Sequence, residues 1–236
     1  MTPLIEPLGE FGFLVRWPGE QIDAAVVACV HALAAQLRAR PPSGMLDIVP
    51  AYSSLGVLFE PELFIQHPDQ PLSDLRQALN AAEFAGAATV ALTPVQESRP
   101  LVEIEVAYGD AHGADFSALC QHSGLSPDQL IAAHTAPEYI VAMLGFAPGF
   151  PYLIGLDPRL HCPRHATPRH QVPAGSVGIA GAQTGIYPHP GPGGWQLIGH
   201  THSPLFDPHS ASPSLLLPGD RVRFRPLSDP TQRGPE

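Results

Sequence analysis

The sequence predicts an α+β protein with an α/β domain at residues 1–95, a β-barrel domain at residues 96–228 and a tail at residues 229–236. Its 236 residues suffice for two modest domains. Helical and strand-like patterns alternate in the first part, whereas short apolar runs cut by glycine and proline follow Glu138. Only 14% of the residues are charged, against 29 prolines and 22 glycines, which favours short strands and tight turns.

The first domain is predicted from five patterns in a row. Their order is strand, helix, strand, strand, helix, at Phe11–Trp17, 21–40, Leu46–Tyr52, Leu55–Glu60 and Ser73–Phe84. The first helix has one apolar face, made by Ile22, Val26, Val30, Leu33 and Leu37. In the second helix Ser73 is the expected N-cap, and Leu75, Leu79 and Ala82 are expected to face inward.

This order suggests a ferredoxin-like fold that still lacks its last strand. Two segments are candidates for that strand, Thr89–Leu92 and Val102–Tyr108. Between them, Thr93–Pro100 is the expected linker to the second domain.

The second domain begins with a strand, Leu101–Tyr108, in which apolar residues alternate with glutamates. Two short helices follow. The second opens at Ser126 with Pro127 at the first helical position and Gln129 three residues after the cap, the pattern of a capping box. The strands beyond Glu138 end with Pro218–Phe224, and the chain after Pro226 is expected to be frayed.

Composition excludes several function classes. The formal net charge is −10, so nucleic acid is a poor partner. All 12 basic residues are arginine, which excludes a Schiff-base lysine, a biotinyl-lysine and a Walker A lysine. The cysteines Cys29, Cys120 and Cys162 are scattered, no signal peptide opens the chain, and no apolar run reaches the roughly 18 residues of a membrane span. A cytoplasmic protein is expected.

Three segments are unusually dense in glycine and proline: 145–156, 162–188 and 191–208. A barrel with many corners is one interpretation. The other is a backbone that lets a ligand or another chain approach closely.

These segments contain a series of short motifs. They are Gly145–Leu153, Pro163-Arg164 with Pro168-Arg169, Val172–Val177, Gln183–Pro188, Pro192–Trp195, Ile198–Thr201 and Leu205–Pro208, with Val49–Tyr52 and Ser123–His134 upstream. Together they resemble the signature of the family that holds KipI, the B subunit of 5-oxoprolinase and allophanate hydrolase subunit 1. This is the carboxyltransferase subdomain C and D type. The resemblance covers most of the chain.

The resemblance implies an N-terminal α/β domain, ferredoxin-like by the element order above, and a C-terminal cyclophilin-like β-barrel. It implies partners of two kinds, a protein of the KipA or 5-oxoprolinase C-subunit type and a LamB/YcsF-type protein that forms the A subunit of 5-oxoprolinase. It also implies ATP, with Mg, at the level of the complex. No metal or biotin is expected on this chain. A cyclophilin-like fold does not by itself imply prolyl isomerase activity.

Six residues are candidates for substrate binding. Arg164 and Arg169 follow prolines and offer planar forks for a carboxylate or phosphate. Gln183 and Thr184 could hydrogen-bond an amide such as a lactam ring, and Tyr187 could donate a proton or stack. Trp195 is either a pocket wall or a barrel plug. The competing interpretations are a surface salt bridge or partner contact for the arginines and turn hydrogen bonds for Gln183, Thr184 and Tyr187. Catalytic residues are not identified.

Histidines raise a distant alternative. The spacing of Gly194, His200, His202 and Asp207 comes close to a cupin metal motif, which would indicate a metal-dependent barrel enzyme. The acidic residue is Asp where a cupin has Glu, and a second cupin block is missing. His200 also departs from the arginine usual in the KipI-type family.

Three functions share this signature. The first is the B subunit of an ATP-dependent 5-oxoprolinase that opens 5-oxo-L-proline to L-glutamate. The second is an inhibitor of a sensor histidine kinase, and the third is a component of an allophanate hydrolase or urea carboxylase type of enzyme. The sequence favours the first and predicts that the chain is inactive alone.

Overall fold

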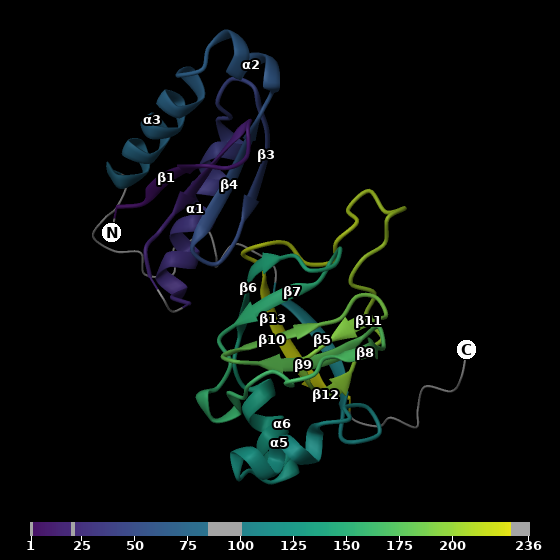
Figure 1. Ribbon diagram of the computed structural model, residues 1–236. Coiled ribbons are helices and arrows are strands. Elements are labelled where there is room, and N and C mark those ends of the chain that lie inside the picture. The colour runs from purple at the N-terminus through teal and green to yellow at the C-terminus, as the bar shows by residue number, and fades with distance from the viewer. Residues whose placement is uncertain (1, 20–21, 85–100, 228–236) are drawn as a thin grey trace. The chain divides into compact units, whose positions relative to one another are not determined.

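The computed structural model describes residues 2–19, 22–84 and 101–227 of the chain, which divides into the units Met1–Ser98 and Arg99–Glu236 (Figure 1). The expected domain boundary between residues 95 and 96, the linker Thr93–Pro100, the candidate strand Thr89–Leu92 and the tail 229–236 lie outside the described residues.

The first unit is a four-stranded antiparallel sheet with the order β1-β2-β4-β3. Its elements are β1 Leu4–Pro7, β2 Gly12–Arg16, α1 Ala24–Ala39, β3 Met45–Pro50, β4 Ser54–Phe59, α2 Pro61–Gln66 and α3 Gln70–Phe84. β2, α1, β3 and β4 have the order and pairing of the first four elements of a ferredoxin-like fold, as predicted.

The expectation for the last strand of this sheet was wrong in one respect. Val102–Tyr108 does not join it, because it lies in the barrel of the second unit as β5. The place beside β2 is taken by β1, which sequence reading missed. A tight turn at Gly9, with φ of 64°, joins β1 to β2, so this pairing is local along the chain. The guanidinium of Arg16 donates to Glu6 across the pair at 3.1 Å.

Two helix boundaries differ from the expected ones. Asp23 caps α1 by accepting from the Ala25 N–H at 2.8 Å, so Ile22 precedes the helix and is exposed. Ser73 lies inside α3, which begins at Gln70. Of the predicted inward residues, Val30, Leu33, Leu37, Leu75 and Leu79 are buried in the core of this unit, and Val26 packs against it partly buried. The side chain of Ala82 lies outside the described ones.

The second unit is built around a closed barrel with the strand order β10-β7-β6-β13-β5-β12-β9. Its strands are β5 Leu101–Tyr108, β6 Tyr139–Leu144, β7 Pro151–Ile154, β9 Ser176–Ala180, β10 Gln183–Ile186, β12 Gln196–His200 and β13 Arg221–Pro226. A separate two-stranded sheet pairs β8 Arg169–Val172 with β11 Gly191–Gly193. The predicted combination of an α/β domain with a cyclophilin-like barrel is confirmed.

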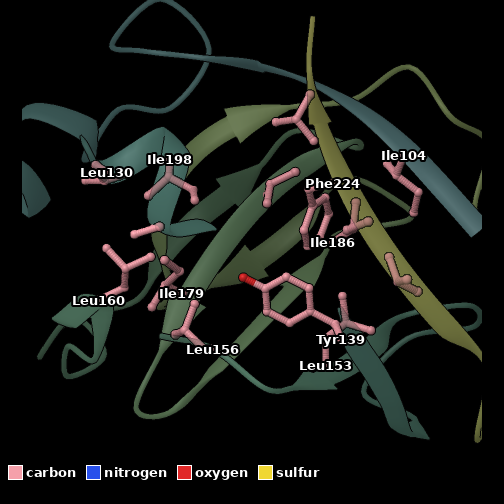
Figure 2. Packing of buried hydrophobic residues seen from close by; sticks show 14 of the residues in the cluster. Ile104, Leu130, Tyr139, Leu153, Leu156, Leu160, Ile179, Ile186, Ile198 and Phe224 are labelled. Atoms are coloured by element: carbon pink, nitrogen blue, oxygen red, sulfur yellow. The ribbon is translucent and has the colours of Figure 1, made fainter. Parts of the chain in front are cut away.

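Aliphatic and aromatic side chains fill the barrel. Figure 2 shows Tyr139 and Phe224 among residues such as Leu153, Ile179 and Ile186, all of them buried. The rings of Tyr139 and Phe224 meet edge to face at 5.3 Å between centroids.

Two helices, α5 Phe116–Ser123 and α6 Pro127–Thr135, lie at one end of the barrel (Figure 1). The predicted capping box opens α6: the Ser126 hydroxyl accepts from the Gln129 N–H, and the Gln129 side chain accepts from the Ser126 N–H. Leu130 of α6 and Phe116 of α5 are buried in the same core as the strands. A 3₁₀ turn at Pro158–Leu160 completes the unit.

Candidate functional site

A cavity of about 280 Å³ opens on the second unit where the three glycine- and proline-rich segments meet. Its lining residues come from all three segments: Phe146, Phe150, Tyr152, Arg164, His165, Pro168, Tyr187, Pro192, Gly193, Gly194 and Trp195. Three of the six predicted site residues, Arg164, Tyr187 and Trp195, are thereby brought together.

Aromatic rings form the walls around Phe150. Its ring lies 4.9 Å from that of Tyr152, 5.2 Å from that of Tyr187 and 5.5 Å from that of Trp195, each edge to face. Edge-to-face contacts of this kind hold rings in fixed orientations. The cavity is therefore a shaped, apolar pocket with few polar groups.

Glycine is required beside these rings. A Cβ at Gly193 would lie 2.4 Å from the Tyr187 hydroxyl, and one at Gly185 would lie 3.1 Å from both Phe150 and Trp195. A side chain at the glycine of the QTGIYP motif or at the first glycine of the PGGW motif would therefore clash with the aromatic rings of the cavity wall.

Arg164 supplies the positive charge of the cavity. Its guanidinium carbon lies 5.8 Å from the centre of the Trp195 ring, within the range of a cation–π interaction. Among residues 2–19, 22–84 and 101–227, no carboxylate forms an ion pair with it. An arginine at an aromatic cavity without an acidic partner suits an anionic ligand.

Two phenols are further polar groups of the cavity. Burial raises the pKa of Tyr187. A hydrogen bond with the Trp195 backbone and the charge of Arg164 act in the opposite direction and lower it, but burial has the larger effect. Burial also raises the pKa of Tyr152, again opposed by Arg164. Both therefore remain neutral at physiological pH, with O–H groups able to donate to a carbonyl.

Arg169 has a different environment from Arg164 and does not line the cavity. Its Nη2 lies 2.6 Å from Oδ1 of Asp115, a carboxylate only 6% exposed, and its Nη1 donates to the Trp195 carbonyl at 3.5 Å. Asp115 also accepts from the Leu197 N–H, and Nε2 of His165 lies 3.2 Å from Oδ1. Burial raises the pKa of Asp115, but the hydrogen bonds from Arg169 and Leu197, together with the nearby His165 ring, outweigh it and lower the pKa. This cluster ties the wall at Trp195 to α5.

Gln183 and Thr184 are placed on β10 and are buried, and neither lines the cavity. The Thr184 hydroxyl donates to the Gly178 carbonyl at 3.0 Å and lies 3.0 Å from Nε2 of the fully buried His134. Since the hydroxyl has one proton, Nε2–H donates to it, and Nδ1 accepts from the Tyr108 hydroxyl at 2.7 Å. Burial lowers the pKa of His134 to about 3, so the ring is neutral.

Sequence reading missed Phe146, Phe150 and Tyr152, although it singled out their segment. The signal was the aromatic–glycine–proline pattern GFAPGFPYL itself. Its most unusual residue is Phe146, the one described non-glycine residue with positive φ, at 67°.

The histidine pattern that suggested a cupin has other contacts. Nε2 of His200 lies 2.9 Å from the Ala174 carbonyl oxygen, and Asp207 accepts from the His209 N–H. Within the described part of the chain, no three His, Cys, Asp or Glu side chains form a group that could hold a metal ion.

The family described as "Carboxyltransferase domain, subdomain C and D" matches residues 3–216. The chain belongs to this family. The resemblance seen in the three dense segments is thus confirmed over most of the sequence.

This chain is similar in sequence or structure to several known proteins. The B subunit of 5-oxoprolinase from Bacillus subtilis (strain 168) is 42% identical over 225 residues, which is 95% of this chain and 93% of the relative. The solved structure of TTHA0988 is 38% identical with a TM-score of 0.76, covering 96% of this chain and 41% of that longer one. Urea amidolyase of K. lactis, at 19% identity and a TM-score of 0.71 over 95% of this chain and 15% of its own, shares the fold.

None of the described helices is both long and apolar enough to cross a membrane.

Proposed function

We propose that this chain is the B subunit of a cytoplasmic, ATP-dependent 5-oxoprolinase that opens 5-oxo-L-proline to L-glutamate together with partner subunits. The observation that carries the proposal is the 42% identity, over 95% of the chain, to a protein named as the B subunit of 5-oxoprolinase. Identity at this level over nearly the whole length of both proteins supports a shared role.

The cavity supports this substrate class. 5-Oxo-L-proline is a small ring with a carboxylate, a lactam carbonyl and a lactam N–H. Arg164 offers a fork for the carboxylate, the aromatic walls offer contacts for the ring, and the phenols of Tyr152 and Tyr187 offer donors for the carbonyl. These three kinds of group match the carboxylate, the ring and the lactam carbonyl of the ligand. We assign Arg169 to holding the wall through Asp115 and not to direct contact.

ATP fits this cavity poorly, since Arg164 is the one arginine among its lining residues and the chain has no lysine. A triphosphate is normally held by several cations or by a glycine-rich loop of backbone amides. We therefore place ATP, with Mg, on the partner subunits. The partners proposed are a protein of the KipA or 5-oxoprolinase C-subunit type and a LamB/YcsF-type protein that forms the A subunit of 5-oxoprolinase.

The test is glutamate release from 5-oxo-L-proline and ATP by the purified chain, by the candidate partners and by all of them mixed. We expect release from the complete mixture alone, because the cavity of this chain fits ATP poorly. Turnover by the isolated chain would contradict partner dependence. A fully assembled mixture that binds but never turns over 5-oxo-L-proline would contradict the proposed reaction.

A further inference from the structure

The backbone at Phe146 is strained. Its φ is 67°, and the Ala147 N–H donates to the Gly145 carbonyl at 2.8 Å, which closes a three-residue γ-turn around Phe146. A bulky residue with positive φ is an outlier that persists only where its surroundings impose it.

The surroundings do impose this turn. The next glycine in the segment, Gly149, has φ of 81°, and a Cβ there would lie 2.7 Å from Cβ of Phe206. The Phe150 N–H donates to the Ala147 carbonyl at 3.0 Å, and the Gly145 N–H donates back to the Phe150 carbonyl at 3.2 Å. The turn is thus held at both ends while Phe146 sits at its tip.

Burial of the Phe146 ring does not offset this strain, since the residue is 64% exposed. The ring nevertheless lines the cavity and meets Phe150 edge to face at 5.4 Å and Tyr187 at 6.2 Å with perpendicular planes. Glycine at this position would fold with less strain. A large aromatic ring kept there at a cost to stability indicates a role in binding.

We propose that Phe146 determines the ligand specificity of the cavity by covering the five-membered ring of 5-oxo-L-proline when Arg164 holds its carboxylate. This inference rests on the function proposed above. An anion at Arg164 leaves the remainder of a small ligand among the aromatic walls, where an exposed ring gains the apolar contact that it lacks in the free protein.

The experiment compares Phe146→Gly, Phe146→Asn and Phe146→Tyr in the full chain and in the reconstituted complex. Glycine and asparagine accept the backbone conformation but remove the ring, whereas tyrosine keeps both ring and strain. We expect Phe146→Gly to raise the unfolding midpoint by about 2–4 °C. We expect it to lower kcat/KM for 5-oxo-L-proline by about 10-fold, mainly through KM, with assembly intact.

Specificity is measured as the ratio of kcat/KM for 5-oxo-L-proline to kcat/KM for 6-oxopiperidine-2-carboxylate, its six-membered lactam homologue. We expect the preference for the five-membered ring to shrink in Phe146→Gly and Phe146→Asn and to survive in Phe146→Tyr. Leu215→Ala, which removes an exposed apolar side chain outside the cavity lining, is the matched control and should leave kinetics unchanged.

Three results would overturn the inference while leaving the proposed function in place. They are wild-type kcat/KM and ring preference in Phe146→Gly, loss of partner assembly as the sole defect, and a lowered unfolding midpoint showing that the ring is held for packing. A wild-type complex that releases no glutamate would instead overturn the proposed function, and the inference with it.

Discussion

Arg164 and Arg169 each follow a proline in the same short segment, yet they end in different surroundings. Arg164 is exposed beside Trp195 at the cavity, and Arg169 is ion-paired with the buried Asp115. Sequence spacing could identify both as potential anion ligands. Sequence spacing could not show that Asp115, 54 residues from Arg169, already forms an ion pair with it.

Arg164→Ala is expected to lower kcat/KM of the reconstituted complex for 5-oxo-L-proline by roughly 10- to 150-fold, because a charged hydrogen-bonded contact contributes about 1.5–3 kcal/mol. Arg164→Lys should recover only part of this, since an ammonium lacks the planar fork. Thermal stability should stay near that of the wild type. Normal kinetics in both variants would show that Arg164 is a solvated surface charge.

Arg169→Ala is expected to destabilise the chain, because it leaves the Asp115 carboxylate buried without its cation. The cost should be about 2–3 kcal/mol, below that of a fully buried pair since Arg169 is 31% exposed, or roughly 5–10 °C in the unfolding midpoint. Arg159→Ala breaks the exposed pair with Asp157 and is the matched control, with an expected loss well below that of Arg169→Ala. Equal losses in thermal melts of the two variants would contradict a structural role for Arg169.

His134 makes stability depend on pH in a defined direction. Its folded pKa is about 3, below the value of 6.5 expected when unfolded, so the unfolded chain binds the proton more readily. The associated stability is present above pH 6.5 and is lost as the pH falls toward 3. Between pH 7 and 5 the wild type should lose about 2 kcal/mol more than His134→Gln, in urea unfolding at each pH. Parallel pH curves for the two proteins would refute this.

At the scale of elements, strand β11 of the small β8–β11 sheet contains two glycines, and only one of them is crowded by the cavity wall. Gly191 and Gly193 are both in β11, two residues apart. A Cβ at Gly193 would meet the Tyr187 ring and hydroxyl at 2.4–2.7 Å, whereas one at Gly191 would meet nothing within 4 Å. The strand is therefore fitted to the cavity wall at one position and free at the other.

Gly193→Ala is expected to cost about 1–3 kcal/mol of stability and to displace Tyr187, since overpacking forces side chains or backbone to shift. The activity of the complex should fall with it. Gly191→Ala should match the wild type in both measurements. Thermal melts and glutamate release of the two variants decide this, and equivalent behaviour would mean that the Tyr187 ring moves aside at little cost.

Other elements show where local sequence patterns were insufficient. The capping box at Ser126 is entirely local and was predicted correctly. β1 is four residues long and contains Pro7, so its pattern was too short to identify, and its place in the sheet depends on pairing with β2. In β10 all four residues are buried, so alternation could not tell that Thr184 contacts His134 and not the cavity.

At the scale of the whole molecule, the described residues form separate hydrophobic cores. One lies in the α/β unit around Leu33, Leu55 and Phe59, and the largest lies in the barrel unit around Tyr139 and Phe224. A third cluster, around Phe150 and Trp195, belongs to the cavity wall of the barrel unit. No described residue is shared between the core of the first unit and those of the second.

A fragment of residues 99–236 is therefore expected to fold alone and to retain the cavity. Its 138 residues are enough for an independent domain, and both the barrel core and the aromatic cluster lie within it. We expect cooperative unfolding and amide and aromatic NMR signals that overlay those of the full chain for the cavity residues. The Arg164→Ala change should perturb the same signals in the fragment and in the full chain. A fragment that lacks cooperative unfolding, or whose Trp195 and Tyr187 signals differ from those of the full chain, would show that the α/β unit is needed to form the site.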